Sequence, residues 1–177
     1  MSNIYFTSDT HWSHKKILEY CPTTRKGATV EEMNRLLIQA WNNKIPPGGV
    51  VYHLGDVSFG KHDETYDILS QLNGEIHLVL GNHDHLMKKG IISERFASIQ
   101  DYKTIKIDGK HIVLFHFPIE SWDRQHYGSI HLHGHVHGNT IDCISSSERK
   151  LRMDVGVDTR TDMAPWSWEE IKEKLEI

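Results

Sequence analysis

Histidine, aspartate and asparagine side chains follow directly after several apolar runs of this 177-residue sequence. The clearest case is Gly81-Asn82-His83-Asp84, which comes after the run 75–80. That run is short, rich in Val, Leu and Ile and stopped by glycine, which is typical of a buried strand. Asn offers a metal a neutral oxygen, His can donate or accept a proton, and Asp can orient the His. Gly-Asn and His-Asp also suit an ordinary turn, so this segment alone leaves both interpretations open.

Four more segments place metal-binding side chains after a predicted strand. In chain order they are Asp9 and His11 after residues 3–8, Asp56 after 50–54, His116 after 110–115, and His135 with His137 after 129–133. Each has a simpler explanation as a turn or a solvated loop, but chance turns do not account for all five in one chain. Oxygen and imidazole ligands without a thiolate suit Mn²⁺, Fe or Zn²⁺, and a pair of such ions suits attack at phosphorus. Fourteen histidines, against twenty Lys plus Arg, also indicate metal chemistry.

The elements that must position these residues alternate between strands and helices in the first half of the chain. Helices are predicted from Thr29, with Glu32 completing a capping box, and over residues 63–72. This alternation with strands predicts a parallel βαβ arrangement. The second half predicts a hairpin over 104–115 with an Asp108-Gly109 turn, strands at 129–133 and 152–155, and a helix from Ser167 through Leu175. No linker or repeat interrupts the sequence, so residues 1–177 are expected to form a single domain.

Composition and charge exclude some classes of partner. The net charge of −4 and the lack of a long basic run argue against duplex DNA, but not against a small phosphorylated substrate held by metals. No apolar run approaches a membrane span, and the N-terminus turns polar too early for a signal peptide. We therefore expect no membrane contact and a cytoplasmic location. Cys21 and Cys143 form no CxxC pair and are expected to be free thiols.

Several other residues have two interpretations. His14 could reach the site, but a solvated histidine is the simpler explanation, and His131 and His133 are interpreted as structural because they lie inside a strand. The aromatic residues Trp12, Trp122 and Tyr127 could stack on a base, although packing is the usual role of such rings. Residues 23–27, including Arg25, could form a mobile loop over the site.

The order Asp-x-His, Gly-Asp, Gly-Asn-His-Asp, His and Gly-His-x-His resembles that of the calcineurin-like metallophosphoesterases. The match runs from Asp9 to His137, and the chain looks like the small stand-alone bacterial and phage members of that superfamily. The resemblance implies an α/β fold, a four-layer αββα sandwich of two mixed β-sheets flanked by helices, with the site at the strand ends. That implied fold agrees with the βαβ pattern read from the residues.

The resemblance also implies a role for each matched residue. One metal would be held by Asp9, His11 and His137, and the other by Asn82, His116 and His135. Asp56 would bridge the two together with a hydroxide. His83 would be catalytic, contacting the substrate phosphate or protonating the leaving oxygen, with Asp84 orienting it. Asn82 and His83 would also contact the substrate.

The implied activity is hydrolysis of a phosphodiester, or of a phosphomonoester, by in-line attack of the metal-bridging hydroxide. A phosphodiesterase is favoured because the small family members tend that way, and Mn²⁺ is favoured with Fe or Zn²⁺ as alternatives. The expected substrate is a small phosphate ester such as a nucleotide or short oligonucleotide. The alternative is a non-catalytic metal-binding scaffold on the same fold, as proposed for a retromer subunit. The presence of His83, Asp84 and every ligand type argues against that alternative.

Overall fold

The first of two β-sheets carries the strands that the βαβ pattern predicts. The computed structural model describes residues 3–139, 144–145 and 150–177; Cys143 and the first two residues lie outside these ranges. The sheet has the order β10 (Trp166–Ser167), β1 (Ile4–Thr7), β2 (Val50–His53), β3 (Glu75–Val79) and β4 (Ser98–Gln100). β1 to β4 are parallel and β10 is antiparallel to β1. The carboxyl ends of β1, β2 and β3 therefore meet at one edge.

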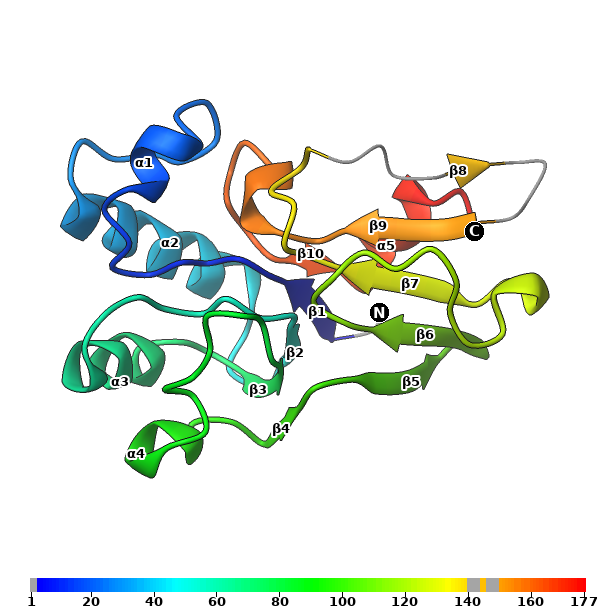
Figure 1. Ribbon diagram of the computed structural model, residues 1–177, viewed down its shortest axis with the longest axis horizontal. Helices are drawn as coiled ribbons and strands as arrows, with labels where there is room; N and C mark the ends of the chain where they lie inside the picture. Colours follow the sequence, from blue (N-terminus) through cyan, green and yellow to red (C-terminus); the bar gives the residue numbers. More distant parts are fainter. Residues whose placement is uncertain (1–2, 140–143, 146–149) are drawn as a thin grey trace.

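Four helices cover the face of this sheet that points away from the second sheet (Figure 1). They are α1 (Ile17–Tyr20), α2 (Val30–Lys44), α3 (His62–Ser70) and α4 (Gly90–Ser93). The Thr29 side chain caps α2 by accepting from the Glu32 amide, as predicted, whereas the Glu32 carboxylate reaches back to the Ala28 amide. Met33, Leu37 and Trp41 of α2 are buried in the same core cluster as β2 and β3.

The second sheet has the order β5 (Lys103–Ile107), β6 (Lys110–Leu114), β7 (Ile130–His133), β9 (Lys150–Asp154) and β8 (Ile144–Ser145). β6, β7 and β9 are parallel, and β5 and β8 pair antiparallel at the edges. The predicted hairpin is present, with positive φ at both Asp108 and Gly109. The apolar core between the sheets includes Phe6 and Leu132, and α5 (Trp168–Lys174) adds Trp168 to it.

The outer face of the second sheet carries the buried histidines His131 and His133. The Trp122 ring lies 5.4 Å from the His131 ring, and the Ile119 amide donates to His131 Nε2. Both contacts come from the segment between β6 and β7, which includes the short helix η1 (Gln125–Tyr127). His131 therefore has the structural role predicted for it, and Trp122 is a packing residue.

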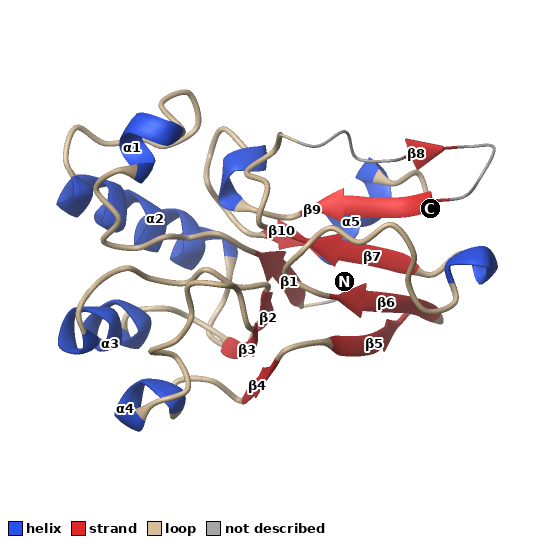
Figure 2. Cartoon of the chain, in the orientation of Figure 1, coloured by secondary structure: helices blue, strands red, loops and turns tan. Residues whose placement is uncertain are grey.

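The predicted fold class is confirmed: two mixed sheets flanked by helices (Figure 2). The complete capping box at Ser167 and Glu170 begins α5 as expected. The pattern did not predict α4, β4, β8 and β10, each of which has at most four residues, nor the short helix η2 (Val157–Thr159) after β9. Within the described ranges, no helix has the length and apolar character needed to cross a membrane.

Candidate metal centre

All seven side chains predicted as metal ligands meet where the loops after β1, β2, β3, β6 and β7 converge. Asp9, His11 and His137 form one group whose ligand atoms lie within 4.8 Å of one another, and Asp56, His116 and His135 form a second such group. Asn82 joins the second group, because its Oδ1 lies 3.1 Å from His116 Nε2. In Figure 1 the arrowheads of β6, β7 and β9 point toward this region in the middle of the molecule.

The backbone at the site is unusual because five of the seven residues have positive φ. These are Asp9 (54°), His11 (48°), Asp56 (56°), His135 (72°) and His137 (51°). Such conformations cost energy for non-glycine residues and persist where the surrounding structure holds them, which is common at functional sites. They aim side chains from sharp turns toward a single point.

Glycines allow the loops to approach closely enough for this arrangement. A side chain at Gly81 would overlap the Asp56 carboxylate, and one at Gly134 would overlap Ser8 and the Asp9 carboxylate. The motif glycines therefore have a steric role where the loops after β1, β2, β3 and β7 meet.

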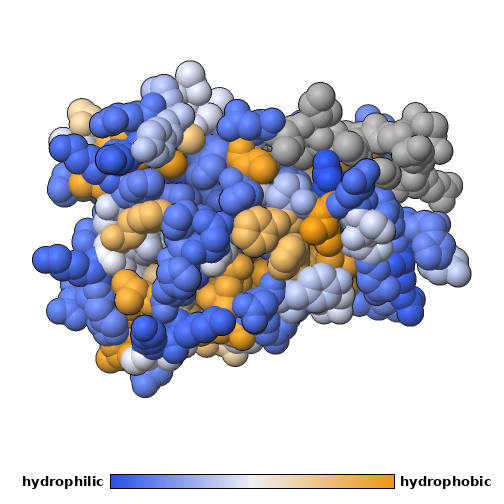
Figure 3. Space-filling view, viewed as in Figure 1, coloured by the Kyte–Doolittle hydropathy of each residue, from blue (hydrophilic) through white to orange (hydrophobic). Residues whose placement is uncertain are grey.

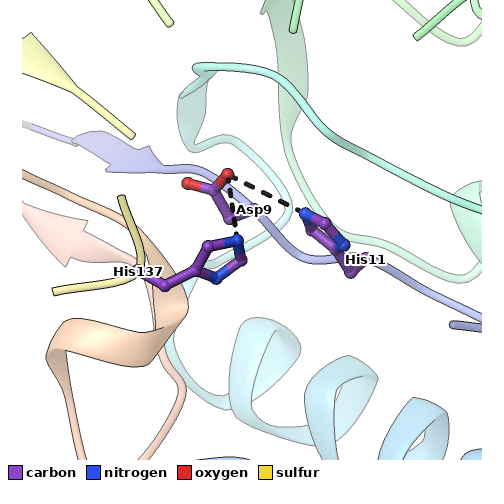
Figure 4. Close-up of side chains that lie close together, drawn as sticks. All are labelled: Asp9, His11 and His137. Atoms are coloured by element: carbon purple, nitrogen blue, oxygen red, sulfur yellow. Dashed lines mark ion pairs between the residues drawn. The ribbon is translucent and has the colours of Figure 1, made fainter. Parts of the chain in front are cut away.

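The first group consists of Asp9, His11 and His137. Asp9 Oδ1 lies 3.9 Å from His11 Nε2 and 4.0 Å from His137 Nε2, so one carboxylate oxygen faces both rings (Figure 4). Asp9 Oδ1 and His11 Nε2 are buried and lack a hydrogen-bond partner in the described part of the chain. Burial raises the pKa of Asp9 to about 7 and lowers the pKa of His11 to about 4. Buried polar atoms usually have partners, and a cation between these atoms would supply one.

The second group is linked to the first through Asp56. Its Oδ2 lies 3.5 Å from His11 Nε2 and 3.6 Å from His116 Nε2, so the carboxylate stands between the two groups. Burial alone would raise the pKa of Asp56, but the neighbouring His11 and His116 side chains hold it at about 2. The Nδ1 of His116 is 2.7 Å from the Leu54 carbonyl oxygen, which can only accept. Nδ1 is therefore the donor in this contact, and Nε2 faces Asn82 and the site.

His83 lies beside both groups without belonging to either. Its side chain is 47% exposed, and its Nε2 is 4.0 Å from Asp56 Oδ2. Its backbone N–H donates to Asp56 Oδ1 at 2.9 Å, which fixes the loop but leaves the ring open to solvent. This placement suits a group that meets the substrate.

The role predicted for Asp84, orienting His83, is not what its hydrogen bonds show. Both carboxylate oxygens accept backbone N–H groups, from Asp56, Val57 and Gly81, each at 2.8 Å. No hydrogen bond from Asp84 to His83 occurs among the described contacts. Asp84 instead joins the loop after β3 to the loop after β2, and so positions Asp56 from 28 residues away. The motif alone does not reveal this role, because adjacent His and Asp side chains need not face each other.

No family model matches the chain, but individual relatives do. An uncharacterised protein of Methanocaldococcus jannaschii is 37% identical over 144 residues, which is 80% of this chain and 73% of that protein. A solved protein of unknown function from Aquifex aeolicus superposes with a TM-score of 0.76 at 29% identity, covering 97% and 98% of the two chains. A solved archaeal phosphodiesterase shares the fold, with a TM-score of 0.51 at 20% identity over 86% and 82% of the two chains.

The ordered motifs, the two ligand groups and the shared fold agree. The chain shares the fold of a solved archaeal phosphodiesterase, the fold that its resemblance to the calcineurin-like metallophosphoesterases implied.

The first ligand group has a support that the sequence analysis did not identify. His137 Nδ1 lies 2.6 Å from Asp158 Oδ2, so His137 Nε2 is turned toward Asp9. Arg25 donates to both Asp158 oxygens at 2.8 Å, and also to the backbone carbonyls of Asp9 and Thr10. Burial alone would raise the pKa of Asp158, but hydrogen bonds from His137 and Arg25 hold it well below its usual range. The sequence did contain a signal for Asp158, because Gly156-Val157-Asp158 places a Gly and an Asp just after β9, as at the other sites.

Arg25 and His14 therefore both lie against the centre, rather than in a loop over the site or in solvent. Arg25 is 5% exposed and hydrogen-bonded to residues of the centre, so its side chain does not lie in an open loop over the site. His14 is in contact with the first group, since its Nδ1 lies 3.0 Å from His11 Nδ1. Both residues are positioned by the turns after β1, which the periodicity of the sequence does not reveal.

Proposed function

We propose that this protein is a phosphodiesterase that works with two divalent metal ions, most readily Mn²⁺. Asp9, His11 and His137 would hold one ion, Asn82, His116 and His135 the other, and Asp56 would serve both. The observation that carries the proposal is the position of Asp56 Oδ2, within 3.6 Å of a ring nitrogen from each ligand group. The fold shared with a solved archaeal phosphodiesterase supports it.

The chain supplies a ligand set that fits such ions. Asp, Asn and imidazole suit Mn²⁺, Fe or Zn²⁺, and buried Asp9 Oδ1 and His11 Nε2 have no other partner in the described chain. When bound, two such ions activate water and neutralise the charge on phosphate oxygens. Asp9 and Asp56 are the only carboxylates in the proposed ligand set, and the other ligands are neutral. The site would therefore keep an excess of positive charge, so a protein of net charge −4 can bind an anion.

His83 is proposed to assist the leaving group. In hydrolysis the water oxygen bonds to phosphorus, the bond from phosphorus to the leaving oxygen breaks, and that oxygen takes up a proton. His83 lies outside both ligand groups with an exposed ring, and its Nε2 stands 4.0 Å from Asp56 Oδ2. It can therefore contact a phosphate oxygen or deliver the proton to the leaving oxygen.

The test is a comparison of two artificial substrates. The protein is stripped with a chelator, reloaded with Mn²⁺ and assayed with bis-p-nitrophenyl phosphate and with the monoester p-nitrophenyl phosphate. We expect metal-dependent turnover that is faster for the diester and lost in His83→Ala. Turnover of the monoester alone would contradict the diesterase proposal, and turnover that survives chelation would contradict the metal centre.

A further inference from the structure

A cavity of about 420 Å³ opens beside the first ligand group. Its lining includes His11 and His137 of that group together with His83, so it is continuous with the proposed catalytic site. A group occupying this cavity would be joined directly to a phosphate held at the centre. The volume lies within the range of small-molecule sites, roughly 300–1,000 Å³.

Aromatic rings form much of the rest of the cavity wall. The Phe59 ring stacks on His14 at 4.0 Å with an interplanar angle of 13°, and lies 4.7 Å from the His83 ring. Tyr20 is also in the lining. Phe59 is 39% exposed and Tyr20 65% exposed. Exposed aromatic side chains beside a catalytic histidine are suited to stacking against a planar group on the leaving side of a substrate.

A second aromatic surface lies against the other ligand group. The Phe117 ring is 4.9 Å from His116 and 4.6 Å from His135. Phe115 continues the row 5.6 Å from Phe117, and Tyr102 follows 6.1 Å from Phe115. Figure 3 shows apolar side chains exposed near the middle of the face where the loop after β6 crosses the sheet in Figure 1.

The two surfaces flank the metal centre. The Phe59 ring lies 4.9 Å from His11 in the first group, whereas Phe117 contacts the second group, and Asp56 stands between His11 and His116. A phosphodiester at the centre would therefore direct one ester group toward each surface. The sequence has no long basic run to follow a phosphate backbone, so stacking would have to supply much of the affinity.

We propose that the substrate is a short single-stranded oligonucleotide, with the base on one side of the scissile phosphate stacked on Phe59 and Tyr20 and the base on the other side stacked on Phe117. This inference rests on the proposed phosphodiesterase activity and adds the substrate class to it. A cyclic mononucleotide has a single base and would leave one surface uncovered.

The experiment compares a thymidine dinucleotide with thymidine methyl phosphate, in which a methyl group replaces one nucleoside. Both are unactivated diesters, so the difference between them reports the second base. With the Mn²⁺-loaded full chain we expect kcat/KM to be about tenfold higher, or more, for the dinucleotide, as base stacking of 1–3 kcal/mol implies.

Variants assign that preference to the two surfaces. The variants of the surface that holds the base missing from thymidine methyl phosphate, either Phe59→Ala and Tyr20→Ala or Phe117→Ala, should lower the ratio of the two kcat/KM values. The variants of the other surface should lower kcat/KM for both substrates alike. Tyr127→Ala, which removes an aromatic ring that is 81% exposed on η1, should leave the ratio unchanged. A loss of metal affects both substrates alike and cancels in the ratio, and Tyr20 is exposed enough to be truncated without threatening the core.

The outcomes separate the two proposals. Equal kcat/KM for the two diesters, with bis-p-nitrophenyl phosphate still hydrolysed, would overturn the oligonucleotide inference and leave the phosphodiesterase standing. A preference for the dinucleotide that all three surface variants retain would also overturn it. Failure to hydrolyse any diester, including bis-p-nitrophenyl phosphate, would contradict the proposed function itself.

Discussion

At the scale of single residues, the account depends on Asp56 and His83 having different tasks. Asp56 is 2% exposed and lies between the two ligand groups, with its pKa held at about 2 despite burial. His83 is largely exposed and contacts the edge of the centre. One residue is therefore expected to hold ions, and the other to act on the substrate.

Variants of these two residues should therefore differ in the amount of metal that they retain. Asp56→Asn should lose both bound metal and turnover, because the amide carries no charge for either ion. His83→Ala should keep its metal and lose turnover by about 10²- to 10⁴-fold, the usual contribution of a general acid. Metal content by elemental analysis, measured beside turnover of bis-p-nitrophenyl phosphate, checks both. Equal metal loss in the two variants would refute the division of roles.

Asp84 provides a second prediction, because its carboxylate accepts three backbone N–H groups. Asp84→Asn leaves one oxygen where there were two, so at least one buried amide loses its partner, at a cost of about 1–3 kcal/mol. We expect lower stability to urea even in the presence of a chelator. If Asp84 served only to orient His83, turnover would fall while the urea midpoint of the metal-free protein stayed the same.

At the scale of elements, the site is built by loops that follow parallel strands and cross one another closely. Gly81 and Gly134 lie where a side chain would overlap Asp56 or Asp9. The strands and helices are ordinary supports, and the chemistry comes from the turns at their ends. This division explains which parts of the structure the sequence could predict.

A glycine substitution tests the steric argument. Gly81→Ala places a methyl group against the Asp56 carboxylate, so this side chain would have to move out of its position between the ligand groups. We expect metal affinity to fall more than the helix content measured by circular dichroism. Gly48→Ala is a suitable control, since neither glycine has positive φ and Gly48 has open space around it. Unaltered metal binding in Gly81→Ala would contradict the close approach of the loops.

Local patterns were sufficient to find the side chains that meet at the candidate centre, and insufficient to find the residues that support them. Asp9 and Asp56 follow neighbouring parallel strands, so their convergence follows from the topology of one sheet. His116 follows β6 of the second sheet and meets them because the two sheets pack together. The contacts of Arg25 and Asp158 depend on how two turns 133 residues apart pack together, and no periodicity in the sequence encodes that. Very short strands such as β10 form because a neighbouring strand offers backbone partners, which is also a tertiary effect.

At the scale of the whole molecule, buried titratable groups link stability to pH. Burial lowers the pKa of His11 and His131 to about 4 and that of His53 to about 3, from an ordinary value of 6.5. Below pH 6.5 the unfolded chain takes up protons that these folded histidines refuse, so they cost stability on acidification. Asp9 has the opposite effect, because its raised pKa of about 7 lets the folded chain hold a proton between pH 3.8 and 7.

Among the groups whose pKa is shifted far within this pH range, three histidines stand against the one carboxyl of Asp9, and this balance decides the direction of the pH dependence. The metal-free protein should become less stable as the pH falls from 6.5 toward 4, seen as a lower urea midpoint at pH 5 than at pH 7. His131→Gln should make this dependence shallower, because it removes one of the three histidines, the one on the outer face of the second sheet. A midpoint that does not change between pH 7 and pH 5 would contradict the buried, neutral state of these histidines.

The most direct test of the central claim is a titration of the metal-free protein with Mn²⁺, with bound metal and hydrolysis of bis-p-nitrophenyl phosphate measured at each step. Because Asp56 faces both ligand groups, the account predicts two ions bound per chain and activity that follows occupancy of the second. Full activity with a single ion bound, or two ions bound with no hydrolysis of any diester, would contradict it.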